Sequence, residues 1–248
     1  MRISKRFELI GHRGAMAHAP ENTLVSFQRA IDMGATMVEL DVHLTRDGEL
    51  VVIHDHELAR TTTGSGLVED MTLAEIRRFD AGIGIHADFR GQKVPTLQEV
   101  LEITSHHVAL NIEIKAGRQT YPKIIDKLLD IIYQYDARNE IVISSFHRAY
   151  LREIRQEDAG IEVALLYSEA VPGILDEAIQ EGWQGLHPWY KLVDRELLNE
   201  AHRLGLSVRA WTVNQLPDMV SLIRLGTDGI CTNFPDILKS VVTELGID

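Results

Sequence analysis

The stretch that decides the fold, residues 207–232, reads SVRAWTVNQLPDMVSLIRLGTDGICT. Its two ends, Ser207–Trp211 and Gly229–Thr232, are short apolar runs of the kind found in buried strands. Between them, residues 217–225 carry apolar side chains at helical spacing. A strand, a helix and a second strand in succession indicate a parallel sheet whose strands are joined by helices.

The same alternation runs along the rest of the chain. The first strands are predicted at Phe7–Gly11 and Met37–His43, and further strands at Val108–Ile114, Ile141–Ser145, Val163–Leu166 and Gln184–Leu186. Helical patterns follow at about 121–136, 148–158, 172–181 and 194–204, and a last one begins at 236. Eight strand–helix units in a chain of this length predict an α/β protein with a closed (β/α)₈ TIM barrel. An open doubly wound sheet is the alternative, and the lack of a GxGxxG after the first strand weakens it.

Residues 55–95 interrupt this rhythm. They follow an extended run at Leu50–His54, and they contain a short helix predicted from the capping box of Thr72 and Glu75. The alternation resumes where Thr96 caps the next helix with Glu99. We therefore expect one domain over residues 1–248, with residues 55–95 as a small insertion after the second strand. For the first helix, Asn22 is the expected N-cap, and Gly34 is expected just beyond its end.

Composition excludes several classes of protein. The 248 residues include 25 Lys and Arg against 37 Asp and Glu, which gives a formal net charge of −12. This balance argues against a nucleic-acid partner and against adsorption to an anionic membrane. The one cysteine, Cys231, rules out an internal disulfide and a CxxC metal site. Because no signal-peptide pattern and no apolar run of membrane-spanning length is found, a cytoplasmic location is expected.

Acidic residues gather at the predicted strand ends, where barrel enzymes hold their active sites. Glu39 and Asp41 are two residues apart on one strand, so their side chains share a face. Asn111, Glu113 and Lys115 share a face of the next barrel strand in the same way. Three neighbouring carboxylates repel each other, and a divalent cation would relieve that repulsion. The all-oxygen set favours Mg²⁺ or Ca²⁺, although Glu113 could instead form a structural ion pair with Lys115 or Arg13.

Two histidines follow apolar extended runs. His12 and His54 are candidates for an acid–base pair, because histidine titrates near neutral pH. Asp55 or Asp41 could orient one of these rings. His187 ends the sixth barrel strand and is a weaker candidate for the substrate pocket. The other eight histidines are expected at the surface: His18, His43, His56, His86, His106, His107, His147 and His202.

Taken together, these motifs resemble the glycerophosphodiester phosphodiesterase family. The resemblance is dense from residue 10 to residue 115, and it is carried by His12-Arg13-Gly14, Pro20-Glu21-Asn22-Thr23, Glu39-Leu40-Asp41-Val42, Leu50–Asp55, Leu58–Thr62, Pro95-Thr96-Leu97 and Asn111–Lys115. It continues more loosely through Ser144-Ser145-Phe146, Trp211–Asn214 and Gly229–Pro235. The family often has Asp where this chain has Asn233, for which we expect only a minor polar role at the barrel rim.

The resemblance implies an enzyme that hydrolyses small glycerophosphodiesters to glycerol 3-phosphate and an alcohol. It implies that Glu39, Asp41 and Glu113 bind the metal ion and that His12 and His54 are the general acid and base. It further implies that Arg13 and Lys115 hold the phosphate oxygens. Phe146 and Trp211 lie at the ends of the fourth and seventh predicted strands and are expected to wall the glycerol group.

Three other functions compete with this interpretation. A lipid phosphodiesterase on the same barrel, of the phosphatidylinositol phospholipase or sphingomyelinase D type, would need a membrane-binding rim, for which the sequence offers no basic amphipathic helix. A non-catalytic binding protein would not need two histidines for proton transfer. A barrel amidohydrolase should carry an HxH pair on the first strand, where this chain has His12-Arg13-Gly14. Stable membrane association is therefore not expected, and the oligomeric state stays open.

Overall fold

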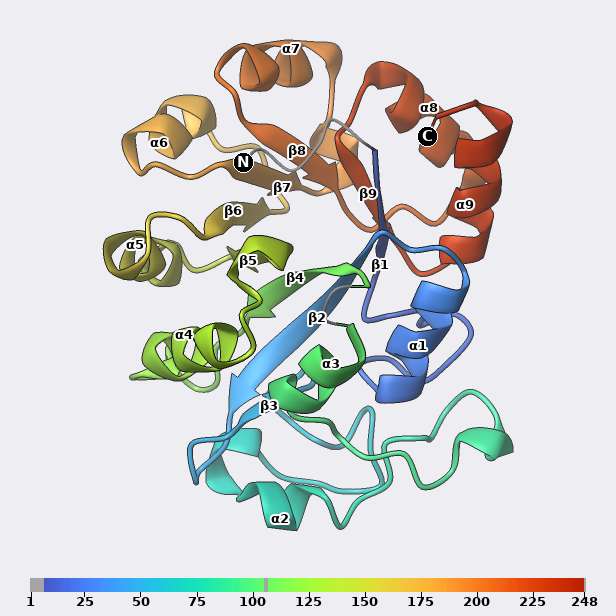
Figure 1. Ribbon diagram of the computed structural model, residues 1–248, viewed down its shortest axis with the longest axis vertical. Coiled ribbons are helices and arrows are strands. Elements are labelled where there is room, and N and C mark those ends of the chain that lie inside the picture. The colour runs from blue at the N-terminus through green and yellow to red at the C-terminus, as the bar shows by residue number, and fades with distance from the viewer. Residues whose placement is uncertain (1–6, 105–106, 248) are drawn as a thin grey trace.

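The computed structural model, which describes residues 7–104 and 107–247, is a parallel barrel of eight strands surrounded by helices (Figure 1). The nine strands are β1 Glu8–Gly11, β2 Met37–Leu44, β3 Leu50–Val52, β4 Ala109–Ile114, β5 Ile141–Ser145, β6 Glu162–Tyr167, β7 Gly185–Pro188, β8 Ser207–Ala210 and β9 Gly229–Thr232. Pairing of β1 with both β2 and β9 closes the barrel. The predicted TIM barrel is confirmed.

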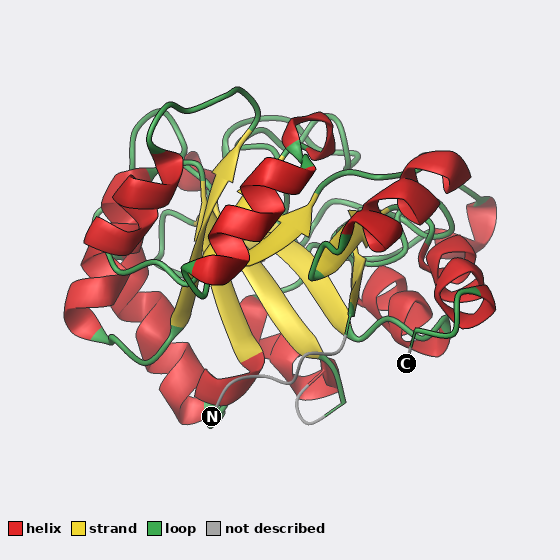
Figure 2. Ribbon diagram, turned by 90° about the horizontal axis from the view of Figure 1, so that it is seen from above, coloured by secondary structure: helices red, strands yellow, loops and turns green. Residues whose placement is uncertain are grey.

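Helices cover the outside of the barrel between successive strands (Figure 2). The α-helices are α1 Leu24–Asp32, α2 Leu73–Ile76, α3 Leu97–Thr104, α4 Ile124–Gln134, α5 Arg148–Glu157, α6 Ile174–Gln180, α7 Arg195–Arg203, α8 Leu216–Leu225 and α9 Pro235–Glu244. The described residues also form short 3₁₀ helices at Val68–Asp70, Ala87–Phe89, Arg138–Glu140 and Tyr190–Leu192. None of the helices in the described part of the chain is long and apolar enough to span a lipid bilayer.

The run at Leu50–His54 is not a barrel strand. Its first three residues form β3, which pairs antiparallel with the end of β2 beyond the barrel. The segment that follows holds α2 and lies beyond β3 and α3 in Figure 1. It packs around a cluster of its own that includes Ile53, Leu58 and Ile76. The two predicted capping boxes, at Thr72 and at Thr96, are present. That residues 55–95 are an insertion within a single domain stays a prediction.

The barrel interior is apolar in the middle and charged at both ends. Ile10, Met37, Val142, Ala164 and Cys231 form the middle cluster. At the amino ends of the strands, the buried guanidinium of Arg209 is paired with two carboxylates, Glu8 on β1 and Glu162 on β6. This ion triad lies in the lower part of the barrel, whereas barrels of this kind hold their functional sites at the upper end, at the carboxyl ends of the strands.

Gly14 allows the chain to turn sharply after β1 and pack against α1. Its φ of +85° lies in the left-handed region, and a Cβ atom there would come within 2.6 Å of the backbone oxygen of Ser26. Ser26 also donates a hydrogen bond from its hydroxyl to the carbonyl of Arg13. The turn that carries His12 and Arg13 therefore depends on the absence of a side chain at residue 14.

Replacing Gly14 by Ala should reduce the free energy of unfolding by about 3 kcal/mol or more, because the left-handed conformation and the collision with Ser26 both penalise the folded state. Gly48→Ala is the matched control, since Gly48 has a φ of +81° but no atom within 4 Å of the added Cβ. That control should lose only about 1 kcal/mol, the cost of the left-handed conformation alone. Urea unfolding measures both values, and equal losses would contradict the packing argument.

Candidate active site

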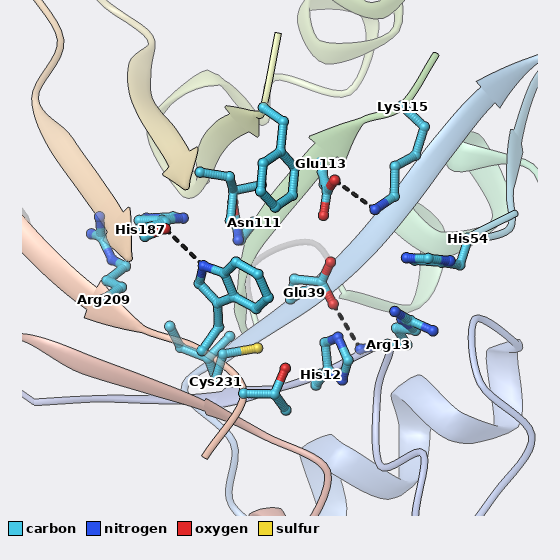
Figure 3. A pocket seen from close by; sticks show the side chains of 15 residues that line it. His12, Arg13, Glu39, His54, Asn111, Glu113, Lys115, His187, Arg209 and Cys231 are labelled. Carbon is cyan, nitrogen blue, oxygen red and sulfur yellow. Dashed lines mark hydrogen bonds and ion pairs between the residues drawn. The ribbon is translucent and has the colours of Figure 1, made fainter. Parts of the chain in front are cut away.

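Three buried carboxylates meet at the upper end of the barrel. Glu39 and Asp41 lie on β2, and Glu113 lies on β4. The parallel register sets Asp41 directly beside Glu113 and Glu39 beside Asn111. One oxygen of each carboxylate lies within 4.8 Å of an oxygen of each of the others. The predicted cluster of three acids is therefore present, and Figure 3 shows Glu39 and Glu113 facing the same space.

The crowding of these groups changes their acidity. Burial, reinforced by the neighbouring Asp41 and Glu113, raises the pKa of Glu39 well above its ordinary value. Burial also raises the pKa of Glu113, to about 7, although Lys115 opposes the shift. Burial acts in the same direction on Asp41, but Lys115 and Arg13 outweigh it and hold the pKa of Asp41 well below its ordinary value. Without additional positive charge, the cluster does not keep all three acids ionised.

Two cationic side chains border the cluster. The Nζ atom of Lys115 lies 2.5 Å from Oε1 of Glu113 and 3.1 Å from Oδ1 of Asp41. Arg13 donates its backbone N–H to Oε2 of Glu39 at 2.8 Å, and its Nε lies 3.4 Å from Oδ2 of Asp41. Burial works against the charge on Lys115, but Asp41 and Glu113 keep the pKa of its ammonium group above the ordinary value. Both cations thus stay charged beside the carboxylates.

The carboxylates could hold a divalent cation. They offer only oxygen ligands, the type that Mg²⁺ and Ca²⁺ prefer. Oδ1 of Asp41 is buried and accepts no hydrogen bond from the described residues, since the Lys115 ammonium lies 3.1 Å away as an ion pair without hydrogen-bond geometry. A cation would satisfy this oxygen and counter the repulsion that raises the pKa of Glu39. The residues present therefore fit a hard metal ion.

His12 follows β1 at the edge of the cluster. Its Nδ1 is hydrogen-bonded to Oδ1 of Asn233 at 2.7 Å, which leaves Nε2 available. Burial, and next the charge of Arg13, lower the pKa of His12 to about 4, so its ring is neutral at neutral pH. The expected minor rim role for Asn233 is wrong, because Asn233 fixes the orientation of His12. The sequence could not reveal this contact between residues 221 positions apart.

His54 is oriented by a carboxylate. Its Nδ1 lies 2.6 Å from Oδ1 of Asp55, one of the two partners predicted from the sequence. Arg60, from the segment beyond β3, binds Asp55 and also Glu21. Glu21 in turn accepts a hydrogen bond from Arg13 at 2.8 Å. A continuous chain of ion pairs therefore connects His54 to Arg13, and neither Glu21 nor Arg60 had been predicted as a site residue.

His43 is buried, so its prediction as a surface residue is wrong. One ring nitrogen is hydrogen-bonded to the hydroxyl of Tyr121 at 2.7 Å, and the other to the carbonyl of His54 at 3.0 Å. His43 has the same strand parity as Glu39 and Asp41, a signal that could have placed it on the inward face. Another of these expected surface residues, His106, lies outside the described residues.

The expected N-cap of α1 is displaced by one residue. Thr23 caps the helix, accepting a hydrogen bond from the N–H of Ser26. Asn22 instead adopts a left-handed conformation with a φ of 56°. Its side-chain amide donates to Oδ2 of Asp41 at 2.8 Å. Asn22 is thus part of the site, because its hydrogen bond holds the Asp41 carboxylate in place.

One pocket of about 270 Å³ is lined by both candidate histidines, both cationic side chains and the carboxylates of Glu39 and Glu113 (Figure 3). Phe146, which is 40% exposed, and Trp211 form one wall, with ring centroids 5.6 Å apart in an edge-to-face arrangement. The Trp211 indole donates to the carbonyl of His187 at 2.7 Å. All the predicted site residues line this pocket except Asp41, which lies behind it within the carboxylate cluster. His187, the weaker candidate, also lines it.

Comparison with known proteins identifies the family. Residues 12–237 match the model of the glycerophosphoryl diester phosphodiesterase family. A glycerophosphodiester phosphodiesterase of Caldanaerobacter subterraneus is 40% identical over 239 residues, which cover 96% of this chain and 98% of that protein. One from Bacillus altitudinis is 35% identical and covers 96% of this chain and 99% of its own.

Solved structures agree with the sequence comparison. A phosphodiesterase from Oleispira antarctica, in complex with the product sn-glycerol-3-phosphate, superposes with a TM-score of 0.90 at 29% identity. The match covers 94% of this chain and 96% of that one. The enzyme from Thermotoga maritima gives a TM-score of 0.77 at 29% identity, covering 94% and 98% of the two chains. The chain therefore belongs to the glycerophosphoryl diester phosphodiesterase family of phosphodiester hydrolases.

Proposed function

We propose that this chain hydrolyses glycerophosphodiesters to glycerol 3-phosphate and an alcohol with one divalent cation, using His12 and His54 as an acid–base pair. The observation that carries the proposal is the convergence of unlike groups in one pocket: three buried carboxylates, two cations and two histidines. The product bound to the Oleispira antarctica relative, sn-glycerol-3-phosphate, is the product expected of this reaction.

Charge neutralisation is the first requirement for cleaving a phosphodiester anion. Glu39, Asp41 and Glu113 would hold the cation, which would supply positive charge to the phosphate oxygens. Arg13 and Lys115 bind further phosphate oxygens from either side of the carboxylates. These local cations attract an anionic substrate into a protein whose formal net charge is −12.

Proton transfer is the second requirement. His12 and His54 each have Nδ1 engaged by an acceptor, Asn233 or Asp55, so that Nε2 is free to exchange a proton. One ring accepts the proton of the attacking hydroxyl, and the other protonates the oxygen of the leaving alcohol. The same two transfers serve direct attack by water. They equally serve attack by the glycerol 2-hydroxyl, which forms a cyclic phosphate that water then opens. Phe146 and Trp211 wall the organic part of the substrate.

Changing either His12 or His54 to Ala should lower kcat/KM for glycerophosphocholine by about 10²–10⁴-fold, the usual contribution of an acid–base group. The exposed His56, two residues from His54, provides the control, and His56→Ala should keep full activity. Circular dichroism should show unchanged folds. A His12 or His54 variant that retains more than about half of the wild-type activity with saturating metal removes that residue from the mechanism.

Chelation by EDTA should abolish hydrolysis, and Mg²⁺ or Ca²⁺ should restore it. Glu113→Gln preserves the shape of the side chain but removes one negative charge, so it should weaken metal affinity and give an activity that excess metal partly recovers. Glu196→Gln, in the exposed first turn of α7, is the control. Calorimetric titration measures metal affinity directly. Full activity after exhaustive chelation would be incompatible with the proposed cofactor.

A small substrate is proposed rather than a lipid bilayer, because the acidic net charge disfavours anionic membranes. The protein should not co-sediment with anionic liposomes at physiological salt, and it should cleave glycerophosphocholine faster than intact phosphatidylcholine. Strong liposome binding, or preferred cleavage of the intact phospholipid, would support the lipid phosphodiesterase alternative instead.

A further inference from the structure

The pocket has a second polar wall that the proposed mechanism does not use. Its side chains are Asn111, on β4, and His187, on β7, and both line the pocket (Figure 3). They are deeply buried, with exposed fractions of 4% and 2%. In the close-up view His187 lies across the pocket from Lys115 and His54, and Asn111 lies between His187 and Glu113.

Each of these side chains has a buried polar atom without a partner. Oδ1 of Asn111 and Nε2 of His187 accept or donate no hydrogen bond among the described residues. Buried polar atoms in folded proteins are nearly always paired, so an unpaired atom facing a pocket indicates a missing ligand or water. Two such atoms on one pocket wall suggest a shared binding function.

Comparison with His43 argues against a purely structural role for His187. Both rings are almost completely buried. His43 has a hydrogen-bond partner at each ring nitrogen, the hydroxyl of Tyr121 and the carbonyl of His54. The neighbouring Arg209 is likewise paired, with Glu8 and Glu162. The polar atoms of His43 and Arg209 are thus paired within the fold, whereas the Nε2 atom of the pocket-lining His187 has no partner among the described residues.

The protonation state of His187 fits recognition of an uncharged group. Burial, and next the guanidinium of Arg209, hold its pKa well below the ordinary value of histidine. The ring is thus neutral at neutral pH, with one N–H donor and one lone pair. A neutral donor and an amide oxygen suit a hydroxyl group better than they suit a second phosphate.

The position of Asn111 indicates which part of the substrate reaches this wall. Lys115, Glu113 and Asn111 follow one another on the inward face of β4, with Lys115 nearest the mouth. Alternate residues are about 7 Å apart along a strand, so Asn111 lies deeper than the groups assigned to the phosphate. A glycerol group extending inward from that phosphate meets Asn111 and His187, while the leaving alcohol lies near the mouth beside the exposed Phe146.

We propose that Asn111 and His187 form a subsite for the terminal hydroxyl of the glycerol group, an inference that rests on the proposed function. A hydroxyl can donate its hydrogen to Oδ1 of Asn111 and accept one from Nε2 of His187, so it satisfies both open atoms at once. A methyl group in the same place satisfies neither. The subsite therefore selects phosphodiesters of glycerol over those of shorter or deoxygenated alcohols.

The test pairs a substrate change with a protein change. Glycerophosphocholine is compared with the phosphocholine ester of propane-1,2-diol, which keeps the hydroxyl next to the phosphoester carbon but has a methyl group in place of the terminal CH₂OH. Wild-type kcat/KM should fall by roughly 10- to 100-fold on the propanediol ester, because the open atoms of the pocket stay unpaired.

His187→Leu should remove most of this discrimination. The variant should lose a similar factor on glycerophosphocholine but almost nothing on the propanediol ester, so that the ratio of the two kcat/KM values approaches one. His187→Gln, which restores a hydrogen-bonding amide, should regain part of the ratio, and Asn111→Leu should reduce it. His147→Leu, at the exposed start of α5, is the control and should leave the ratio unchanged.

Two results overturn the subsite. One is a wild-type enzyme that cleaves both esters equally well. The other is a folded His187→Leu variant that loses activity equally on both esters, which indicates a structural role. If the wild-type protein with metal cleaves neither ester, the proposed function itself fails, and the subsite fails with it.

Discussion

The register between β2 and β4 is the constraint on which the site depends. It sets Asp41 beside Glu113 and brings three carboxylates within 4.8 Å of one another in a buried place. Such crowding opposes folding unless positive charge accompanies it. Lys115 and Arg13 provide part of that charge, yet the pKa of Glu39 stays raised. The upper end of the barrel thus carries buried negative charge that Lys115 and Arg13 do not fully balance and that a cation could balance.

The sequence predicted the features that depend on local pattern. Strand parity placed Glu39, Asp41 and Glu113 together, and the apolar alternation predicted the barrel. The sequence did not predict the roles of residues whose partners lie far away along the chain. Asn22 has a side chain suited to a helix cap, but it donates a hydrogen bond to Asp41 instead, and Thr23 caps the helix. Asn233 orients His12 from the far end of the chain, a contact created only when β9 closes the barrel against β1.

The groups that orient the histidines belong to elements outside the barrel as well as within it. Arg60 contacts both Asp55 and Glu21, so one residue after β3 fixes the surroundings of His54 and of Arg13. Residues that share a network in this way have coupled, non-additive effects when they are changed. The segment beyond β3 therefore helps to position His54 and Arg13 through Asp55 and Arg60. The site is a property of the barrel and this segment together.

The ion triad of Arg209, Glu8 and Glu162 has a kinetic consequence. Its buried charges lie toward the amino ends of the strands, so substrate entry and product release in the proposed reaction would share the mouth at the carboxyl ends. With the glycerol group innermost, as proposed, the alcohol would leave first and glycerol 3-phosphate last. Glycerol 3-phosphate would then be the product that competes with incoming substrate.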